Sequence, residues 1–304
     1  MNRQMLSRSK TLLLVVPGFI SIALNGQSTN DLRNRVSQII ASKNATVAVS
    51  IKGVESSDTL SVNGNVLMPM MSVFKFHIAL AVLNKVDQGK LQLNQLFFIK
   101  KGDLYPGTWS PIRDEYPDGN MYLTLDQLLR YTVSHSDNNG CDLLLNIIGG
   151  TKTVQRFINK QGIRPFTIKM NEQQMSTWEN LYVNTTSALA TTKLLEKFYK
   201  GNVLKQHTTR YLYQIMVETS RGLTWMKAGL PAGTELAHRT GISDINSDHL
   251  RAALNDVGIV KLANGQYFIL SVYLKNIREE RAATEKIIAD ITTAAWDYFN
   301  RNAK

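Results

Sequence analysis

Ser72 and Lys75 lie three residues apart in a stretch that predicts the start of a buried helix. Apolar residues recur at three- and four-residue steps over residues 76–86, and Gly89 supplies a natural stop. Side chains three apart lie one above the other on a helix face, so the Lys75 amine can reach the Ser72 hydroxyl at the positive end of the helix dipole. This is the geometry of an activated serine nucleophile, although a serine at a helix start is more often only a cap.

Three further stretches carry polar side chains that could act with this pair. The Ser-Asp-Asn triplet at residues 136–138 lies where one predicted helix ends and the next begins. Glu172 lies in the long irregular segment 163–184, and such loops in compact domains tend to be functional. The His-Arg-Thr-Gly run at residues 238–241 ends a predicted strand, where glycine lets a substrate lie along exposed backbone.

The elements that must position these groups predict an α+β fold. Alternating apolar residues predict strands at residues 46–52, 58–63, 235–240, 253–262 and 267–274. Helical spacing appears at residues 31–42, 124–133, 138–148, 151–160, 186–200, 208–218 and 284–299. Because strands occupy both ends of the chain, we expect one antiparallel sheet flanked by helices, with an all-helical subdomain inserted into it.

The domain organisation follows from the same pattern. Residues 1–26 join a positively charged head to an apolar run, which predicts an export signal that is removed. Residues 27–304 predict a single domain. Its sheet subdomain is expected over residues 27–66 and 217–304, and its helical subdomain over residues 67–216.

Composition excludes several classes of function. The net charge is +11, but the basic residues are scattered and not interleaved with aromatics, so we expect no nucleic-acid partner. The single cysteine, Cys141, allows no internal disulfide and no lipid anchor after the signal, so we expect no stable membrane anchor. The five histidines show no ligand spacing, so no metal or other cofactor is expected. We expect the substrate to be a small molecule and the protein to be a monomer.

Taken together, the four stretches resemble the class A serine β-lactamases, whose motifs are S-x-x-K, S-D-N and K-T-G. Their order and spacing fit from Ser72 to Gly241. The chain resembles the PER-like extended-spectrum branch in its runs SDNNGCD at 136–142, NEQQM at 171–175 and LPAGT at 230–234. The resemblance implies the serine β-lactamase/D,D-peptidase fold, hydrolysis of β-lactams with antibiotic resistance, a periplasmic location, and a preference for cephalosporins.

The resemblance also implies a role for each catalytic residue. Ser72 would attack the lactam carbonyl and form an acyl-enzyme. Lys75 would take the serine proton directly, or Glu172 would do so through a water. Ser136 would pass a proton to the departing lactam nitrogen. Glu172 would activate the water that hydrolyses the acyl-enzyme.

The residues that the family uses for binding can be carried over in the same way. The backbone N–H groups of Ser72 and Ile242 would form the oxyanion hole. Relatives bring an extra arginine to the substrate carboxylate, and here both Arg221 and Arg251 are candidates. The implied substrate-binding positions are Trp109 at the mouth of the cleft, Asn138, Arg239, Thr240, Gly241 and Ile242.

The sequence departs from the family pattern at three positions. Arg239 replaces the usual lysine, which keeps the positive charge but weakens any role in proton relay. Ser176 replaces the usual asparagine, so one holder of the hydrolytic water is shorter. Gln173 replaces a proline that follows a cis bond, so we expect a trans bond after Glu172 and a differently shaped loop.

Two alternatives share the fold. A penicillin-binding D,D-peptidase has the serine and lysine but lacks the glutamate that hydrolyses the acyl-enzyme, and Glu172 argues against it. An inactive exported binding protein would need no intact reacting residues, whereas this chain retains Ser72, Lys75 and Ser136.

Overall fold

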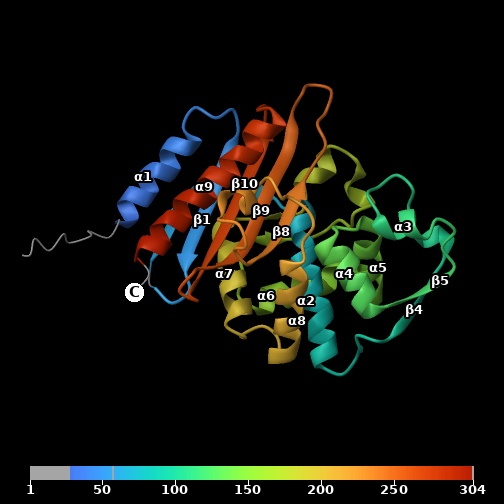
Figure 1. Cartoon of the computed structure of the whole chain (residues 1–304). Helices are drawn as coiled ribbons and strands as arrows, with labels where there is room; N and C mark the ends of the chain where they lie inside the picture. The colour runs from blue at the N-terminus through green and yellow to red at the C-terminus, as the bar shows by residue number, and fades with distance from the viewer. Residues whose placement is uncertain (1–27, 57, 303–304) are drawn as a thin grey trace, which may run out of the picture.

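A five-stranded antiparallel sheet forms one side of the molecule (Figure 1). The computed structural model describes residues 28–56 and 58–302, so the predicted export signal at residues 1–26 lies outside the described residues. The strand order is β2-β1-β10-β9-β8, so the two ends of the chain meet in one sheet, as predicted. The strands are β1 (Thr46–Gly53), β2 (Thr59–Val62), β8 (Leu236–Ile242), β9 (Arg251–Lys261) and β10 (Tyr267–Ile277).

Helices cover both faces of this sheet. The first and last helices, α1 (Thr29–Ile40) and α9 (Arg281–Asn302), pack on one face, and α7 (Ala188–Tyr199) contacts β1 and β10 on the other (Figure 1). Strands β9 and β10 are therefore buried along most of their length. Strand β8 is an edge strand, and its free edge faces the helical part of the molecule.

The helical part is built around α2 (Phe74–Asp87), whose first ten residues are all buried. A helix that is apolar on every side needs neighbours all round, and α2 contacts α4, α5, α6 and α8. Only two polar side chains, Lys75 and His77, are completely buried in it. The other helices are α3 (Pro111–Glu115), α4 (Leu125–Ser134), α5 (Asn138–Ile148), α6 (Thr151–Lys160) and α8 (Gln206–Val217).

The structure differs from the sequence prediction at the short elements. Ser72 lies in a separate 3₁₀ turn, η1 (Met71–Val73), and not in the first α-helical turn, because α2 begins at Phe74. The sequence prediction also missed five short strands, which are too brief to show periodicity. They are β3 (Met68–Pro69), β4 (Leu96–Ile99), β5 (Met121–Thr124), β6 (Phe166–Thr167) and β7 (Thr185–Thr186).

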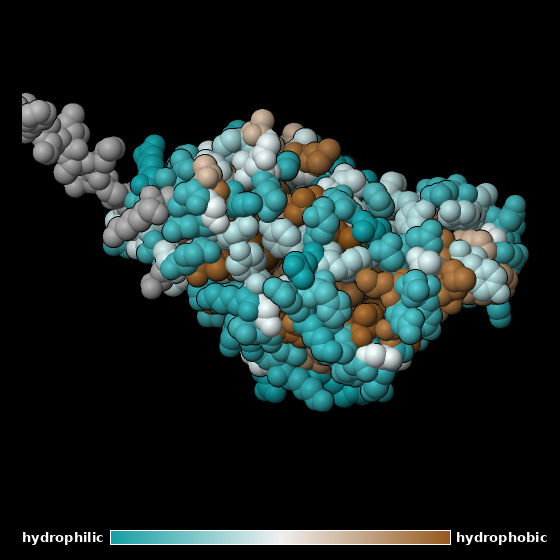
Figure 2. All heavy atoms as spheres, turned by 60° about the horizontal axis from the view of Figure 1, so that its bottom comes forward, coloured by the Kyte–Doolittle hydropathy of each residue, from teal (hydrophilic) through white to brown (hydrophobic). Residues whose placement is uncertain are grey.

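The surface is mostly hydrophilic on the face seen in Figure 2, and its hydrophobic side chains form small separate groups. No helix in residues 28–56 and 58–302 is both long and apolar enough to cross a membrane. Cys141 is completely buried in the helical core, where burial raises the pKa of its thiol well above the usual value. Buried among apolar side chains, Cys141 is an inert part of the core.

Candidate active site

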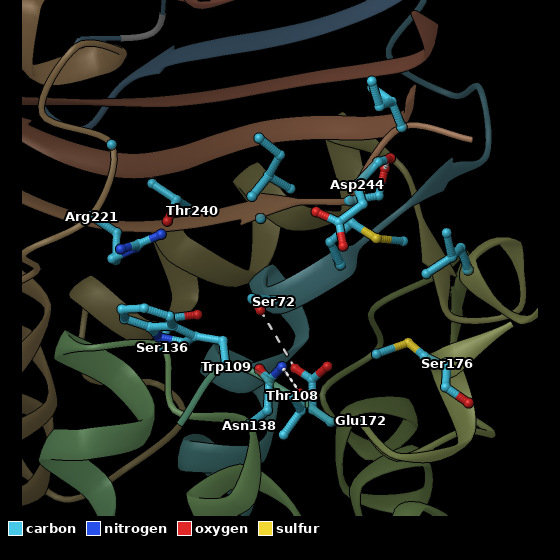
Figure 3. Close-up of a pocket in the computed structure, with 18 of the residues that line it drawn as sticks. Ser72, Thr108, Trp109, Ser136, Asn138, Glu172, Ser176, Arg221, Thr240 and Asp244 are labelled. Carbon is cyan, nitrogen blue, oxygen red and sulfur yellow. Dashed lines mark hydrogen bonds between the residues drawn. The ribbon is translucent and has the colours of Figure 1, made fainter. Parts of the chain in front are cut away.

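The Ser72 turn is held between the helical core and the edge of the sheet. Asn255 on β9 donates from its side-chain amide to the carbonyl oxygens of Pro69 (2.8 Å) and Met70 (3.1 Å). Met71 adopts a left-handed backbone conformation with φ 46°, which turns the chain into η1. Ser72 is thereby placed at the floor of a cleft, directly before α2 (Figure 3).

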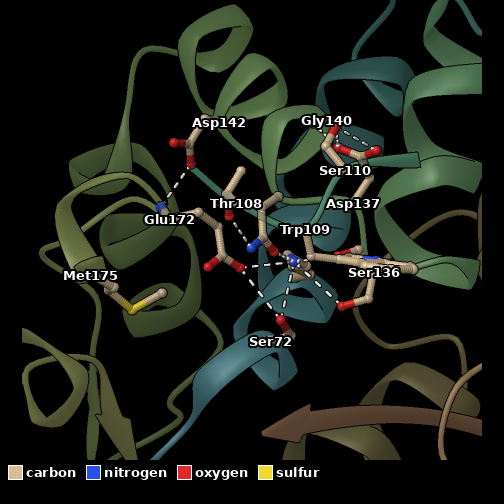
Figure 4. Close-up of polar contacts among 12 residues, drawn as sticks. Ser72, Thr108, Trp109, Ser110, Ser136, Asp137, Gly140, Asp142, Glu172 and Met175 are labelled. Carbon is tan, nitrogen blue, oxygen red and sulfur yellow. Dashed lines mark hydrogen bonds and ion pairs between the residues drawn. The ribbon is translucent and has the colours of Figure 1, made fainter. Parts of the chain in front are cut away.

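Lys75 is the centre of a buried polar network. Its Nζ lies 3.1 Å from Ser72 Oγ and 2.8 Å from the carbonyl oxygen of Ser136. It also donates to Asn138 Oδ1 and forms an ion pair with Glu172 Oε1 at 2.8 Å. The side chain is completely buried, so a charged amine there needs this set of acceptors. The four residues that the sequence analysis took from distant stretches thus meet at one ammonium group (Figure 4).

Glu172 approaches the nucleophile directly. Its Oε1 lies 3.4 Å from Ser72 Oγ, close enough for one water to contact both groups. The peptide bond between Glu172 and Gln173 is trans, as predicted, since the cis bond among the described residues precedes Pro165. The carboxylate can therefore serve as a base beside the serine without the loop shape that a cis bond would give.

Asp142, which was not among the residues predicted for the site, fixes the backbone of Glu172. Its carboxylate accepts hydrogen bonds from the N–H groups of Glu172 (2.8 Å) and Gln173 (3.1 Å). Burial raises the pKa of Asp142 to about 6, against the lowering effect of these two bonds. The signal for it in the sequence is that Asp142 is the only charged residue of α5 and lies one turn after Asn138.

The Ser-Asp-Asn turn is held by its middle residue. Asp137 is completely buried and accepts from Ser110 Oγ (3.0 Å) and from the N–H groups of Ile112 and Gly140 (2.7 Å each). Burial raises the pKa of Asp137, and these hydrogen bonds oppose the change. Ser136 takes a left-handed conformation, φ 63°, which turns its side chain toward Lys75 and the cleft.

Strand β8 forms the opposite wall of the cleft. A Cβ on Gly241 would lie 2.6 Å from the carbonyl oxygen of Met70 and 3.1 Å from the backbone nitrogen of Ser72, so only glycine allows this approach. The contact brings the edge of β8 beside the Ser72 N–H, and Ile242, the next residue, lines the same cleft. Two backbone donors are thus available near Ser72, one from each wall.

Arg239 is buried behind the side chain of Ser136. Its guanidinium is completely buried and Nη2 donates to Ser136 Oγ at 2.6 Å, while Nε and Nη1 have no hydrogen-bond partner among the described residues. Burial lowers the pKa of Arg239 to about 10. Thr240 lines the cleft, whereas Arg239 reaches it through Ser136. The Arg239 guanidinium therefore lies behind the cleft wall, with the Ser136 side chain between it and the cleft.

The cleft has a volume of about 820 Å³ and extends well beyond Ser72 (Figure 3). Trp109 stands at its mouth with 47% of its surface exposed, and the Arg221 guanidinium lies 4.5 Å above the centre of its ring. Arg251, the other candidate for the substrate carboxylate, instead donates to the carbonyl oxygen of Ser243. Ser176, the substituted residue of the Glu172 loop, lines the far side. Within the described part of the chain, no cluster of three or more His, Cys, Asp or Glu side chains could hold a metal ion.

Comparison with known proteins agrees with this geometry. Residues 31–299 match the family described as the beta-lactamase enzyme family. The chain belongs to the beta-lactamase enzyme family. The resemblance to class A serine β-lactamases of the PER-like, extended-spectrum branch is confirmed, as are the fold and the enzyme class.

Individual relatives cover almost the whole β-lactamase chain. Beta-lactamase VEB-1 of Pseudomonas aeruginosa is 41% identical over 293 residues, which are 95% of this chain and 97% of that protein. Extended-spectrum beta-lactamase PER-1 of the same organism is 37% identical over 291 residues, 95% of this chain and 93% of that protein. The crystal structure of TLA-3 extended-spectrum beta-lactamase has a TM-score of 0.88 at 43% identity and covers 90% of this chain and 100% of that one.

Proposed function

We propose that this β-lactamase hydrolyses the lactam amide of penicillins and cephalosporins through an acyl-enzyme on Ser72. The observation that carries the proposal is the position of Glu172, 3.4 Å from Ser72 Oγ and 2.8 Å from Lys75 Nζ. A carboxylate beside the nucleophile can activate water against the ester. That step separates a hydrolase that turns over from a penicillin-binding protein that stays acylated.

Acylation begins with loss of the Ser72 proton. Lys75 can accept it across 3.1 Å when its amine is neutral, or the Glu172 carboxylate can accept it through a water. In the first route the proton ends on Lys75 and Glu172 stays ionised, and in the second it ends on Glu172, from which it can pass to Lys75 across their 2.8 Å contact. The serine oxygen then bonds to the lactam carbonyl carbon, and the backbone N–H groups of Ser72 and Ile242 stabilise the oxyanion.

Ring opening requires a proton on the lactam nitrogen. Ser136 Oγ is the donor that we propose, since it lies 3.4 Å from Lys75 Nζ and accepts from Arg239 at 2.6 Å. Both cations favour a partly deprotonated Ser136 as its proton leaves. A proton from Lys75 then restores the Ser136 hydroxyl, so Glu172 is ionised when hydrolysis begins. Glu172 takes a proton from a water, the water oxygen attacks the ester, and the proton passes from Glu172 to the departing Ser72 oxygen, which restores the serine and releases the opened product.

Substrate binding would use the rest of the cleft. Asn138 Nδ2 donates to Thr108 Oγ1 at 2.5 Å, which holds its amide ready for the substrate side-chain amide. Thr240 and Gly241 present the exposed edge of β8. The substrate carboxylate would lie toward Arg221, because Arg251 is engaged with Ser243, and the buried Arg239 adds its charge from behind Ser136.

Bulky cephalosporins are the preferred substrates that we propose. The cleft of about 820 Å³ continues past Ser72 to Ser176 on one side and Asp244 on the other, which leaves room for a large acyl side chain. The relatives PER-1 and TLA-3 are named extended-spectrum enzymes. We also propose that residues 1–26 direct export to the periplasm and that residues 27–304 act there as one monomeric domain made of a sheet and a helical subdomain.

The test is hydrolysis of a chromogenic cephalosporin by the purified protein and by Ser72→Ala. We expect turnover by the first and none by the second, with both proteins folded by circular dichroism. Comparable turnover by the two would exclude Ser72 as the nucleophile. A panel with a simple penicillin and a bulky cephalosporin tests the preference, and greater efficiency on the simple penicillin would contradict it.

A further inference from the structure

The short segment 219–222 carries Arg221 to the cleft, and it is tied to strand β8 at both ends. Thr219 Oγ1 donates to the carbonyl oxygen of His238 at 2.8 Å. Gly222 has φ +69°, and a Cβ there would lie only 2.6 Å from the methyl group of Thr240. The segment therefore packs closely against β8, with the Arg221 side chain between Thr240 and Trp109 (Figure 3).

His135 ties the same segment to the opposite wall. Ser220 donates its N–H (3.0 Å) and its hydroxyl (3.2 Å) to the carbonyl oxygen of Ser134. His135 Nδ1 lies 3.1 Å from Ser220 Oγ. The Ser220 hydroxyl has one proton, which can be directed to the carbonyl oxygen of Ser134 or to His135 Nδ1, so the contact joins His135 to Ser220 in either tautomer. His135 is the C-cap residue of α4, and the helix fixes its backbone.

The same residue anchors Trp109. The indole Nε1–H donates to the carbonyl oxygen of His135 at 3.0 Å, and the Arg221 guanidinium lies 4.5 Å above that ring. Arg281, the other cleft arginine beside Arg221, is paired with Glu285 at 2.7 Å, while Arg221 has no ion pair within the described residues. Arg221 is thus held in position by its neighbours with its donors left for an anion.

We propose that His135 is a positioning residue for the β-lactamase reaction. Through Ser220 and Trp109 it holds the Arg221 guanidinium where the substrate carboxylate binds. The inference rests on the proposed function, since it takes a substrate carboxylate as the ligand of Arg221. His135 itself is exposed and touches none of the reacting atoms, so it acts only through these two neighbours.

The first test compares His135→Ala with His135→Asn by steady-state kinetics on a chromogenic cephalosporin. Loss of one hydrogen bond of ordinary strength predicts a KM raised about three- to tenfold in His135→Ala, with kcat changed less than twofold. Asparagine places a side-chain N–H close to the position of Nδ1 and should restore most of the affinity. The matched control is His207→Ala, another exposed histidine, which lies beside Asp87 at the end of α2. Unchanged KM in His135→Ala would overturn the proposal.

A double-mutant cycle tests whether the effect passes through Arg221. In an Arg221→Ala background, His135→Ala should cause no further rise in KM, because the group that it positions is gone. A full additional rise would mean that His135 acts elsewhere, and would overturn the proposal.

A measurement without substrate separates this inference from the proposed function. The indole ¹H–¹⁵N resonance of Trp109, assigned as the one lost in Trp109→Phe, should move in His135→Ala toward its position in Arg221→Ala. An unmoved resonance would overturn the positioning role even if the enzyme hydrolyses cephalosporins. A moved resonance with no hydrolysis by the wild type would overturn the proposed function but would still support the positioning of Arg221 by His135.

Discussion

The carboxylate of Asp142 accepts a hydrogen bond from the backbone N–H of Glu172 at 2.8 Å (Figure 4). A second bond, from the N–H of Gln173 at 3.1 Å, reaches the other carboxylate oxygen. Asp142 lies one turn after Asn138 on α5, so a single helix positions both a Lys75 partner and the backbone of Glu172. The location of the carboxylate beside Ser72 therefore depends on α5 as much as on its own loop.

Asp142→Ala removes both acceptors, and we expect deacylation to slow more than acylation. Hydrogen bonds to a charged group contribute about 1.5–3 kcal/mol each, so a fall of tenfold or more in the deacylation rate is expected. Stopped-flow measurement of the two steps with a chromogenic cephalosporin provides the check. The deacylation rate of Asp142→Asn, which keeps one acceptor, should lie between the rates of the wild type and Asp142→Ala. Equal loss in both steps would point to general unfolding of the site.

The pKa of Asp142 predicts how stability depends on pH. Burial raises this pKa from 3.8 to about 6, so between these values the folded protein binds more protons than the unfolded chain. The stabilisation that Asp142 contributes is therefore fully present below pH 3.8 and is lost as the pH rises through about 6.

Urea unfolding of the wild type and Asp142→Asn at several pH values measures this contribution. The free energy of unfolding of the wild type, relative to the variant, should fall from pH 4 to 6 and level off above 7. A difference that grows with pH over that range would show that the hydrogen bonds outweigh burial and that the pKa is lowered.

Glu172→Gln keeps the shape of the side chain and removes the base, so the acyl-enzyme should accumulate. General base catalysis contributes about 10²–10⁴-fold, and we expect a loss of that order in deacylation. Intact-protein mass spectrometry after mixing with a cephalosporin should show a covalent adduct on the variant. The control is Glu179→Gln, an exposed acid in the same loop region, which should turn over like the wild type. Unchanged turnover by Glu172→Gln without an adduct would exclude it as the deacylation base.

Long periodic elements were predictable from the sequence. Helices α5 and α6 match the predicted residues 138–148 and 151–160, since their apolar faces repeat over several turns. The antiparallel sheet that joins the chain ends is likewise confirmed. By contrast, a turn such as η1 depends on contacts made 170 or more residues away, including those from Asn255 and Gly241. The local sequence around residue 72 gives no information on these long-range contacts.

The candidate site could also be predicted only in part. The motifs identified the residues that meet at Lys75, because those residue types are needed for the chemistry. Asp142 and Thr108 were missed, since each acts through a partner that is near only in the folded chain. The depth of Arg239 was also unpredictable, because a motif gives the residue type and not its burial.

Arg239→Lys tests what the buried guanidinium contributes. Burial lowers the pKa of Arg239 to about 10, so the wild type keeps this charge through pH 9 and its kcat/KM should lose nothing from this group below that pH. A lysine begins from a lower pKa and is lowered by the same burial. The variant should therefore lose activity at a lower pH on the basic side. Profiles of kcat/KM between pH 6 and 10 provide the measurement, and parallel basic limbs would contradict the expectation.

Gly241→Ala tests the approach of β8 to the nucleophile. The new Cβ would lie 2.6 Å from the carbonyl oxygen of Met70 and 3.1 Å from the backbone nitrogen of Ser72, so the strand and η1 must separate. Loss of one oxyanion donor costs about 10²–10³-fold in kcat, and we expect a fall of about 100-fold. The control is Gly102→Ala, where a Cβ meets no atom within 4 Å and the backbone is not left-handed.

Stability and activity must be measured together on Gly241→Ala, because overpacking also destabilises. A forced separation costs about 1–3 kcal/mol, which urea unfolding detects while the protein remains folded under assay conditions. If the two backbone N–H groups must converge for acylation, kcat falls far more than this loss of stability explains. A variant with normal kcat and reduced stability would mean that the oxyanion is stabilised without the Ile242 N–H, and that the close contact at Gly241 serves packing alone.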